Sequence, residues 1–459
     1  MLDITADSRK VKKGDIFVAV RGIDGDGHHY IKQAIANGAS KIIAEEGKYD
    51  IPYEIVDDSR AYLLSYLKKH YNPKLRNIKF VGITGTNGKT TTAFLLYQAL
   101  RKMGIKSAYI GTIGFYLEDK VRSLPNSSPD IWDSYDMFME AKEAGCKYII
   151  EEVSSHALAY GRIEGYLFDY VLFTNLTQDH LDFHKTMGNY ALAKQLLFKK
   201  LKKKGKAFIN IDDKYKEYFL LPENENITFG FTGGDYKIDS YEMQPNGTTF
   251  TYEHKGQIYE TSMKLIAEYN LYNMLGAISI LSEMGYADKL STVIPLLTAP
   301  LGRMETIAYR NNHIIIDYAH TPDAVEKILK TMKKICKGKM YVTFGCTGGR
   351  DRTKRPIMLS LACNLADYVI ITNDDLHFED PKQIVADMTE GISYTNYEVC
   401  LDRKKAIEKG IDLLKEGDTL LVLGKGHEEA MIVGNEYIPF SDKKVVSAYL
   451  QKKGQFVES

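Results

Sequence analysis

The segment Gly82-Ile-Thr-Gly85-Thr-Asn-Gly88-Lys89-Thr90 has the residue types and the spacing of a loop that binds phosphate groups. Its glycines let backbone N–H groups turn toward an anion, and a helix that starts at the loop adds a favourable potential. The usual motif has glycine at position 83, where this chain has Ile83, so the loop is a compact variant. The plainer alternative is a glycine-rich turn between a strand and a helix. We expect nucleotide binding through Gly85, Thr86, Asn87, Gly88, Lys89, Thr90 and Thr91, with Lys89 on the outer phosphates and Thr90 on Mg²⁺.

Two clusters of acids and histidines follow predicted strands farther along the chain. Glu152 and His156 come at the end of the apolar run 147–153, and His180 follows the run 169–174. Ligands of parallel sheets bind at the carboxyl ends of the strands, so both clusters are expected beside the phosphate loop. Carboxylate oxygens suit Mg²⁺ that bridges phosphate groups. Each side chain alone would more often be structural, but their common position favours a nucleotide and metal site.

Alternating strands and helices are expected to position these clusters. Short apolar runs alternate with helical patterns such as 91–103, and this alternation indicates βαβ units with a mostly parallel sheet. Asn246-Gly247 interrupts strands within 227–265, which predicts a β-hairpin, and a helix is expected over 269–284. The runs predicted to form strands are 16–20, 41–44, 78–84, 147–153, 169–174, 313–317, 340–344, 368–372 and 419–423.

The chain has 459 residues, which is enough for about three domains. We predict an α/β protein with a small N-terminal domain at 1–77, a central ATPase-like domain at 78–299 and a Rossmann-like C-terminal domain at 300–459. The central domain is expected to have a parallel sheet with an antiparallel extension. Pro300-Leu301-Gly302 marks the second boundary.

Composition excludes several classes of function. Lys plus Arg and Asp plus Glu both number 60, so the formal charge is zero and a nucleic-acid-coating or polybasic membrane protein is not expected. No apolar run approaches the roughly 18 residues of a membrane span, and no signal peptide is recognisable. The five cysteines are scattered, which favours reduced thiols over a disulfide framework or a zinc site. We expect a cytoplasmic monomer.

Further motifs continue in order along the chain and resemble the Mur ligase family. They are Asp7-Ser8-Arg9, the phosphate loop, Glu152-Val-Ser-Ser-His156, Asp179-His180-Leu-Asp182, Tyr190-Ala-Leu-Ala-Lys194, Gly302-Arg303-Met-Glu305, Asp317-Tyr-Ala-His320-Thr-Pro-Asp323 and Gly424-Lys-Gly-His427-Glu428. Within that family they are most similar to the E-type enzymes, the UDP-N-acetylmuramoyl-tripeptide synthetases. The resemblance covers all three predicted domains.

The resemblance implies an ATP-dependent amide ligase of cell-wall precursor synthesis. In this family ATP phosphorylates a peptide carboxylate, and an amino acid's amine then attacks the acyl phosphate. Carried over by position, the catalytic residues are Lys89, Glu152, His180 and Lys194. Two Mg²⁺ ions would be held by Thr90, Glu152, His180 and a carbamate on Lys194. From residue type alone, Lys194 would be an exposed helical lysine. Further ATP contacts would be Asn273, Arg303, Asp317, Tyr318 and His320; from residue type alone, Asn273 would be a surface amide and Asp317 a strand-end cap.

The resemblance also implies contacts to a UDP-linked muramyl-type peptide. Asn126-Ser127-Ser128-Pro129 replaces the family's Asn-Thr-Thr-Pro and keeps its hydroxyl groups, and Tyr160 replaces a polar family residue. The acceptor contacts carried over are Ser8, Arg9, Asn126, Ser127, Ser128, Ser155 and Arg162. For Ser127-Ser128-Pro129 the residue types alone favour a simple turn.

The motif that selects the amino acid departs from the family. E-type enzymes that add meso-diaminopimelate carry Asp-Asn-Pro-Arg, whereas this chain has Asp374-Asp375-Leu376-His377. Arginine binds a carboxylate bidentately, while histidine is a weak substitute and an added aspartate would repel that carboxylate. We therefore expect L-lysine or a similar basic amino acid, held by Asp374, Asp375 and His377, with Arg350, Gly424 and Glu428 binding the α-carboxylate and α-amine. The alternative is that Asp375 caps a helix and does not contact substrate.

Three alternatives remain open at this point. Another ligase of the superfamily, of the folylpolyglutamate or cyanophycin type, is one, and a pseudomurein peptide ligase with a different acceptor is another. The third is a non-catalytic relative that acts as a partner or scaffold subunit. The chain keeps all five residues that the resemblance assigns to catalysis and metal binding, which disfavours this third alternative: Lys89, Thr90, Glu152, His180 and Lys194.

Overall fold

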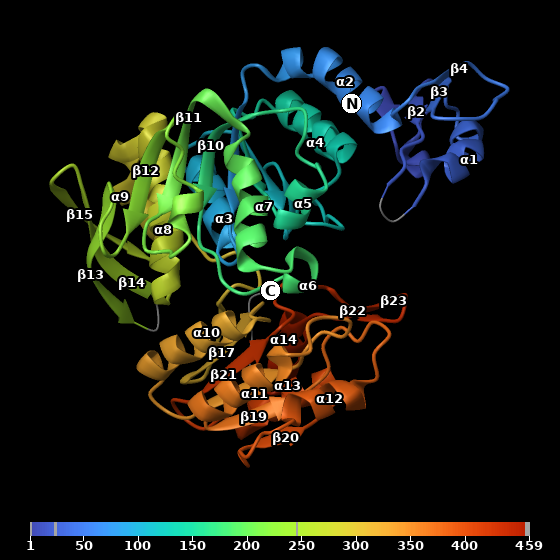
Figure 1. Ribbon diagram of the computed structural model, residues 1–459. Coiled ribbons are helices and arrows are strands. Elements are labelled where there is room, and N and C mark those ends of the chain that lie inside the picture. The colour runs from blue at the N-terminus through green and yellow to red at the C-terminus, as the bar shows by residue number, and fades with distance from the viewer. Residues whose placement is uncertain (1, 23–24, 245–246, 455–459) are drawn as a thin grey trace.

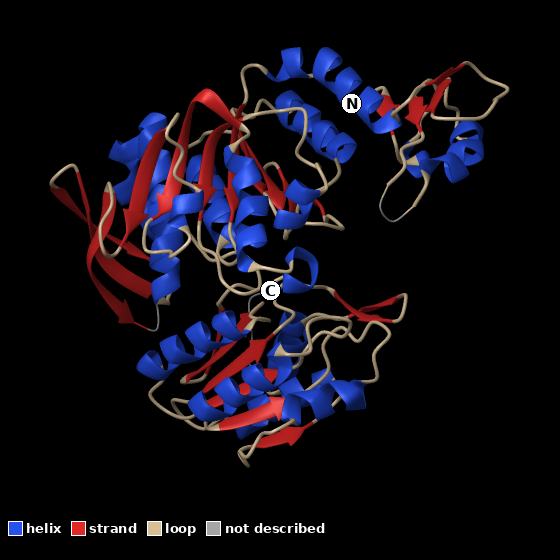
Figure 2. Cartoon of the chain, in the orientation of Figure 1, coloured by secondary structure: helices blue, strands red, loops and turns tan. Residues whose placement is uncertain are grey.

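The computed structural model describes residues 2–22, 25–244 and 247–454. It confirms the predicted α/β fold. In the described residues, three larger sheets follow one another along the chain, and a two-stranded hairpin sheet comes after them (Figure 1). Helices cover these sheets, and the C-terminal part of the chain packs below the central part in this view (Figure 2). Within the described ranges, every helix is too short or too polar to span a lipid bilayer.

The N-terminal sheet is small and parallel, with strands in the order β1-β2-β3-β4. Its strands are β1 (Ile4–Thr5), β2 (Ile16–Val18), β3 (Lys41–Ala44) and β4 (Tyr53–Ile55). The helices are α1 (Ile31–Ala36) and α2 (Ser59–His70). Buried Leu63 and Leu67 of α2 belong to a core that also contains Phe80 and Phe138, so α2 joins this sheet to the central one.

The central sheet is parallel in its middle and antiparallel at both edges, as the sequence predicts for one edge. Its order is β15-β14-β13-β12-β11-β10-β5-β9-β6-β7-β8. The bounds are β5 (Lys79–Thr84), β6 (Ser107–Gly111), β7 (Gly114–Tyr116), β8 (Lys120–Arg122), β9 (Tyr148–Glu152), β10 (Phe168–Phe173), β11 (Leu201–Asn210), β12 (Glu225–Gly230), β13 (Tyr236–Gln244), β14 (Gly247–His254) and β15 (Gln257–Met263). Asn246 of the predicted hairpin turn lies outside the described residues, but β13 and β14 pair antiparallel on either side of it.

Helices cover both faces of the central sheet because each presents an apolar stripe. Leu95 of α3 and Leu275 of α8 belong to the core on one face, while Tyr135 of α4 and Leu197 of α7 belong to the core on the other. The bounds are α3 (Lys89–Lys102), α4 (Ile131–Glu143), α5 (Ser155–Ala159), α6 (Leu181–His184), α7 (Met187–Phe198), α8 (Glu268–Leu281) and α9 (Leu290–Val293).

The C-terminal sheet has the order β16-β17-β21-β18-β19-β20, with only β16 antiparallel among these strands. The bounds are β16 (Glu305–Tyr309), β17 (Asn312–Asp317), β18 (Met340–Phe344), β19 (Tyr368–Ile371), β20 (Tyr397–Val399) and β21 (Thr419–Leu423), followed by the hairpin β22 (Ala430–Val433) and β23 (Glu436–Pro439). The helices are α10 (Pro322–Ile335), α11 (Lys354–Leu365), α12 (Pro381–Thr389), α13 (Arg403–Leu413) and α14 (Asp442–Lys452).

Differences from the predicted elements are concentrated at their ends. The strand predicted over 16–20 stops at Val18, and the helix predicted from residue 91 already begins at Lys89. The helix expected over 269–284 ends at Leu281, because a wider turn over Ser282–Tyr286 with Gly285 at φ 89° follows. The sequence also gave no separate expectation for β11, whose lysine-rich first half, 202–206, lacks the apolar pattern of a buried strand.

Candidate active site

The phosphate loop connects β5 to α3 and is shaped by two glycines. Gly85 has φ 150°, and a Cβ there would lie 1.8 Å from Thr174 Oγ1. Gly88 has φ 85° and caps the N-terminus of α3. Lys89 Nζ donates to the carbonyl oxygens of Gly85 (2.9 Å) and Thr86 (2.8 Å). The loop is therefore wrapped around its own lysine, and burial lowers the pKa of that amine.

The end of β10 is bonded directly to this loop. Thr86 N donates to Asn175 O at 2.8 Å, and Asn87 N donates to Asn175 Oδ1 at 3.0 Å. Thr174 Oγ1 donates to Asn87 O at 2.7 Å. These bonds fix the segment that leads to His180 against the phosphate loop. The structure thus brings the loop and the second cluster together.

Glu152 ends β9 and points toward the start of α3. Its Oε2 accepts a hydrogen bond from Thr90 Oγ1 at 2.8 Å, and its Oε1 accepts from Thr112 N at 2.9 Å and from the Tyr109 hydroxyl. The carboxylate is fully buried. A hydroxyl and a carboxylate oxygen at this distance are hard donors of the kind that Mg²⁺ prefers, so Thr90 and Glu152 fit a magnesium ion.

His180 lies beside Asp179, with His180 Nε2 3.3 Å from Asp179 Oδ2. Its ring centroid is 4.7 Å from that of His156. Burial lowers the pKa of His180 to about 4. The imidazole is therefore neutral at neutral pH, which is the form that can bind a metal ion.

Lys194 is buried, contrary to what its residue type alone predicts. It projects from α7 with 1% of its surface exposed, and its Nζ donates to Gly85 O at 2.6 Å. The same amine lies 4.5 Å from the centroid of the Tyr190 ring. Burial, and then the charge of Lys89, hold the pKa of Lys194 well below its ordinary value. The amine thus lies beside the phosphate loop, and its assignment as a carbamylated metal ligand stays a prediction.

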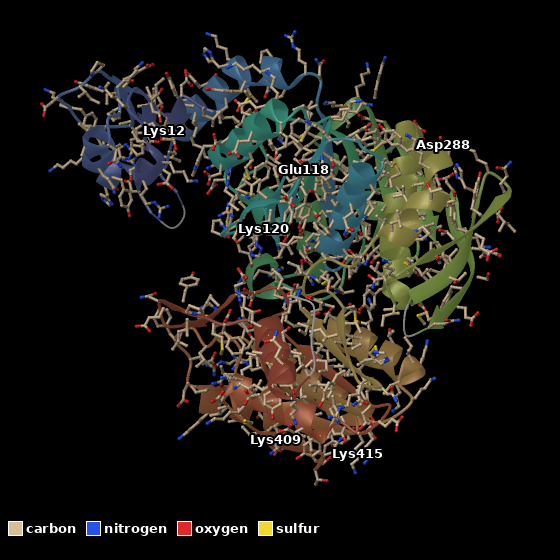
Figure 3. All side chains as sticks on the ribbon, turned by 180° about the vertical axis from the view of Figure 1, so that it is seen from behind. Lys12, Glu118, Lys120, Asp288, Lys409 and Lys415 are labelled. Carbon is tan, nitrogen blue, oxygen red and sulfur yellow. The ribbon has the colours of Figure 1, made fainter. Side chains whose placement is uncertain are left out.

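A cleft of about 1240 Å³ separates the phosphate loop from the C-terminal sheet. Lys120, at the edge of the central domain that faces the C-terminal domain, is one of its lining residues (Figure 3). The predicted site residues that line it are Thr86, Asn87, Gly88, Lys89, Thr90, Thr91, Asn126, Ser127, Glu152, His180, Arg303, Tyr318, His320, Arg350, Asp374, Asp375, His377, Gly424 and Glu428.

The nucleotide candidates of the C-terminal domain divide into cleft residues and supporting residues. Arg303 stacks on the Tyr318 ring at 4.6 Å, and its Nη2 is 3.5 Å from Thr90 Oγ1 across the cleft. Asp317 is buried and accepts hydrogen bonds from the backbone of Met304 and Ala319, as a strand-end cap does. Burial raises the pKa of Asp317.

Asn273 lies beneath the phosphate loop, on the buried side of α8. It accepts a hydrogen bond from Thr92 Oγ1 at 3.3 Å and donates to Asn270 Oδ1 at 3.0 Å. A Cβ on Gly88 would lie 2.3 Å from Asn273 Oδ1, so the loop rests on this amide. The interpretation of Asn273 as a surface amide, drawn from its residue type, is therefore wrong.

The predicted amino-acid end of the cleft holds three carboxylates and one buried ammonium group. Oxygens of Asp374, Asp375 and Glu428 lie within 4.8 Å of one another. Lys425 Nζ is 2.8 Å from Asp375 Oδ1 and 2.7 Å from Glu428 Oε2. Asp375 Oδ1 also accepts from Ile432 N at 2.9 Å. Asp375 is thus already paired, which weakens the expectation that it repels a carboxylate, and it does not cap a helix.

The acceptor candidates are more dispersed. Asn126 and Ser127 line the cleft, whereas Ser128 is buried and donates to Glu152 O at 2.8 Å. Ser155 is buried 3.0 Å from His184 Nε2, and Arg162 contacts Asp130 at 3.4 Å.

In the N-terminal domain, the two candidates make contacts within their own domain. Ser8 Oγ donates to Gln33 Oε1 at 2.7 Å, and the exposed Arg9 pairs with Asp7 at 2.8 Å. Neither is among the residues that line the cleft. Any contact of these two residues with a substrate would therefore have to come from a ligand that extends beyond the cleft.

Sequence reasoning gave no site function to Lys425, Asp179 or Asp323. Lys425 lies within the Gly424-Lys-Gly-His-Glu428 motif, but the pattern gives no reason to pair it with Asp375, fifty residues earlier. Asp323 Oδ2 accepts from the Asn87 side chain at 2.9 Å and so joins α10 to the phosphate loop. The signal for Asp323 in the sequence is its place at the end of the motif Asp317-Tyr-Ala-His320-Thr-Pro-Asp323.

Comparison with known families gives a match in each domain. Residues 3–71 match the Mur ligase family catalytic domain, 83–281 match the Mur ligase middle domain, and 302–426 match the Mur ligase glutamate ligase domain.

Two similar proteins match almost the whole length of the chain. A UDP-N-acetylmuramoyl-L-alanyl-D-glutamate--2,6-diaminopimelate ligase of Bacillus cereus is 40% identical, with 96% of this chain and 92% of the relative covered. The enzyme of the same name from Aquifex aeolicus is 39% identical, with 98% and 94% covered.

Solved structures show the same architecture. A ligase of that name has a TM-score of 0.69 at 29% identity, with 98% of this chain and 95% of that chain covered. A MurF ligase from Thermotoga maritima in complex with ADP has a TM-score of 0.70 at 20% identity, with 98% of both chains covered, which shows the fold alone. The chain therefore belongs to the Mur ligase family of ATP-dependent ligases.

Proposed function

We propose that this enzyme joins an amino acid to the D-glutamate carboxylate of UDP-N-acetylmuramoyl-L-Ala-D-Glu. The observation that carries the proposal is one cleft with a phosphate loop on one wall and a cluster of carboxylates around Gly424 and Glu428 on the other. The names of the whole-chain relatives support the acceptor. Folylpolyglutamate synthase is similar at 14% identity, which concerns the fold alone and does not favour that substrate.

The reaction requires two transfers. An acceptor carboxylate oxygen attacks the γ-phosphorus of ATP, ADP leaves, and an acyl phosphate forms; the amine then attacks the acyl carbon, phosphate leaves, and the amine loses a proton. Lys89 and Arg303 supply positive charge where the phosphoryl group moves, and enclosure by both domains limits hydrolysis of the acyl phosphate. Mg²⁺ held by Thr90 and Glu152 would neutralise charge on the phosphates.

Lys194 is proposed to carry a carbamate. Only the neutral amine reacts with CO₂, and the lowered pKa of buried Lys194 favours that form. The modification would replace a cation by an anion beside Gly85. The Lys194 amine and the His180 ring both lie near the Tyr190 ring, at 4.5 Å and 6.3 Å from its centroid. Together with Glu152 and neutral His180, it would offer ligands to a second Mg²⁺.

For the amino acid we propose a substrate whose side chain ends in an ammonium group, with L-lysine as the first candidate. Three carboxylates around one buried ammonium leave a net negative site. Position 377 holds histidine, and Arg350 on the neighbouring loop is assigned to the α-carboxylate. Diaminopimelate is the second candidate, because the relatives' names specify it and it also carries a distal ammonium group.

The test is ADP release by the full chain with ATP, Mg²⁺ and UDP-N-acetylmuramoyl-L-Ala-D-Glu, with L-lysine, L-ornithine and meso-diaminopimelate in parallel. Turnover that depends on lysine supports both proposals. Turnover only with diaminopimelate keeps the acceptor and overturns the choice of lysine. If ATP binds but none of the three supports turnover, the acceptor is wrong, and a pseudomurein-type precursor is tested next.

A further inference from the structure

Two irregular loops that carry the amino-acid candidates are packed directly on each other. One loop connects β18 to α11 and carries Arg350; the other connects β19 to α12 and carries Asp375. Gly348 N donates to Asp375 O at 2.7 Å. A Cβ on Gly348 would lie 2.1 Å from Leu376 O. The two loops therefore cannot move independently without losing this contact.

A buried arginine forms hydrogen bonds with both of these loops. Arg355, at the start of α11, donates two hydrogen bonds of 2.8 Å to the two carboxylate oxygens of Glu379. Its Nη2 also donates to Thr347 O at 3.3 Å, in the loop of Arg350. Asp387 of α12 accepts from Nη1 at 2.6 Å. One guanidinium group thus connects α11, α12 and both loops.

Glu379, in the loop of Asp375, also contacts the loop of Arg350 directly. Its Oε2 accepts from Gly349 N at 2.9 Å, one residue before Arg350, and its Oε1 forms an ion pair with Arg352 Nη2 at 2.8 Å. The Arg355 side chain is fully buried, and the hydrogen bonds from Arg355 lower the pKa of Glu379 to about 2. Bidentate charge-assisted bonds of this kind fix the relative orientation of both partners.

We propose that Arg355 and Glu379 are positioning residues that set the distance between Arg350 and the Asp374–His377 segment and thereby determine which amino acid is accepted. The inference rests on the proposed function, because it assumes that the amino acid binds between these loops. Neither residue lines the cleft, so each acts through the loop backbone. Displacement of a binding group by about 1 Å can change rates by about a hundredfold.

The test compares Glu379→Ala with Glu379→Gln in the full enzyme. The alanine variant leaves Gly349 N without its acceptor and Arg355 with one partner fewer, whereas the glutamine variant keeps an acceptor oxygen in the same place. We expect KM for the amino acid to rise about tenfold or more in Glu379→Ala and less in Glu379→Gln, with KM for ATP unchanged. The ratio of kcat/KM between L-lysine and diaminopimelate should change as well. Arg355→Lys, which loses the bidentate pair but keeps the charge, should behave like Glu379→Ala.

Met388→Ala provides a control for stability. Met388 is fully buried in α12, next to Asp387, and its truncation lowers Tm without removing a contact of the pair. It should leave KM for the amino acid unchanged. The inference is overturned if folded Glu379→Ala keeps the wild-type KM and amino-acid preference, or if Met388→Ala changes them equally. Absence of amino-acid-dependent turnover in the wild-type enzyme would instead overturn the proposed function.

Discussion

Two lysine amines donate to the same backbone carbonyl at the phosphate loop. Lys89 Nζ is 2.9 Å and Lys194 Nζ is 2.6 Å from Gly85 O. Burial is the first cause of the lowered pKa of both amines, and the charge of Lys89 further lowers that of Lys194. Anionic phosphates at the loop, or a carbamate on Lys194, would relieve this repulsion.

Lys89→Ala removes the amine from the loop centre and should lower kcat for ADP release at least about a hundredfold, because charge on the transferring phosphoryl group loses its nearest cation. Lys102→Ala, at the exposed far end of the same helix, is the matched control and should leave kcat unchanged. Near-normal turnover of Lys89→Ala would contradict the assigned phosphate contact.

Asp375→Asn combined with His377→Arg restores the family's residues at these two positions. The introduced guanidinium group can bind the distal carboxylate of diaminopimelate bidentately, a gain of about 1.5 kcal/mol or more. We expect kcat/KM for diaminopimelate relative to lysine to rise about tenfold. His377→Gln alone, which adds no cation, should not produce the shift. An unchanged preference in the double variant would show that this motif does not select the amino acid.

At the scale of elements, β9 places two adjacent glutamates on opposite faces of the central sheet. Glu152 faces the phosphate loop, whereas Glu151 is buried in the core and accepts hydrogen bonds of 2.8 Å and 3.0 Å from the Tyr166 hydroxyl. Burial raises the pKa of Glu151 to about 7. The strand that presents Glu152, the proposed metal ligand, therefore contains a carboxyl group that is protonated in the folded state below that pH.

Glu151→Gln should consequently become more stabilising as the pH rises. An unfolded chain loses this proton near pH 4.5, whereas the folded chain keeps it to about pH 7, so wild-type stability falls across that window. The glutamine at position 151 does not titrate. The free energy of unfolding of the variant, relative to that of the wild type, should therefore rise by about 3 kcal/mol between pH 4.5 and 7. Urea unfolding at several pH values measures this difference. Glu223→Gln, an exposed loop change, should show no such trend, and a pH-independent difference for Glu151→Gln would contradict the prediction.

At the scale of the whole molecule, polar contacts link the central and C-terminal domains across the cleft. Asp323 of α10 accepts from Asn87 of the phosphate loop at 2.9 Å, and Arg303 approaches Thr90 at 3.5 Å. Ile266 of the central domain also belongs to the apolar core of the C-terminal domain. Relative domain motion would therefore have to keep this apolar contact while the polar contacts change. Nucleotide binding at the loop would therefore be coupled to the position of the C-terminal domain.

Asp323→Ala removes one of these contacts and should favour the open arrangement. A hydrogen bond worth about 1 kcal/mol corresponds to about a fivefold change in the open–closed equilibrium. We expect a larger radius of gyration without nucleotide by small-angle scattering, and an apparent KM for ATP raised about fivefold. Lys330→Ala, on the exposed face of α10 and paired with Glu326, is the control. Unchanged scattering and KM would show that Asn87–Asp323 does not hold the domains together.

Local patterns were sufficient for much of the fold and the phosphate site. The bounds of β3, β18 and β21 match the predicted runs 41–44, 340–344 and 419–423, because short apolar segments between turn residues have few alternatives to a buried strand. The phosphate loop was equally predictable, since its glycines, its lysine and the following helix are neighbours in sequence.

The tertiary structure alone decided the properties that depend on distant partners. Lys194 has the local sequence of an exposed helical lysine, and only the packing of α7 against β5 buries its amine beside Gly85. In the sequence, Asp375 is an additional negative charge with no visible partner. The neighbouring strands β18, β19 and β21 bring Lys425 Nζ to 2.8 Å from its Oδ1. The sequence by itself determined the family, the α/β class, several of the strands and the phosphate loop. Burial and charge compensation came from contacts between residues far apart in the chain, which no local pattern specifies.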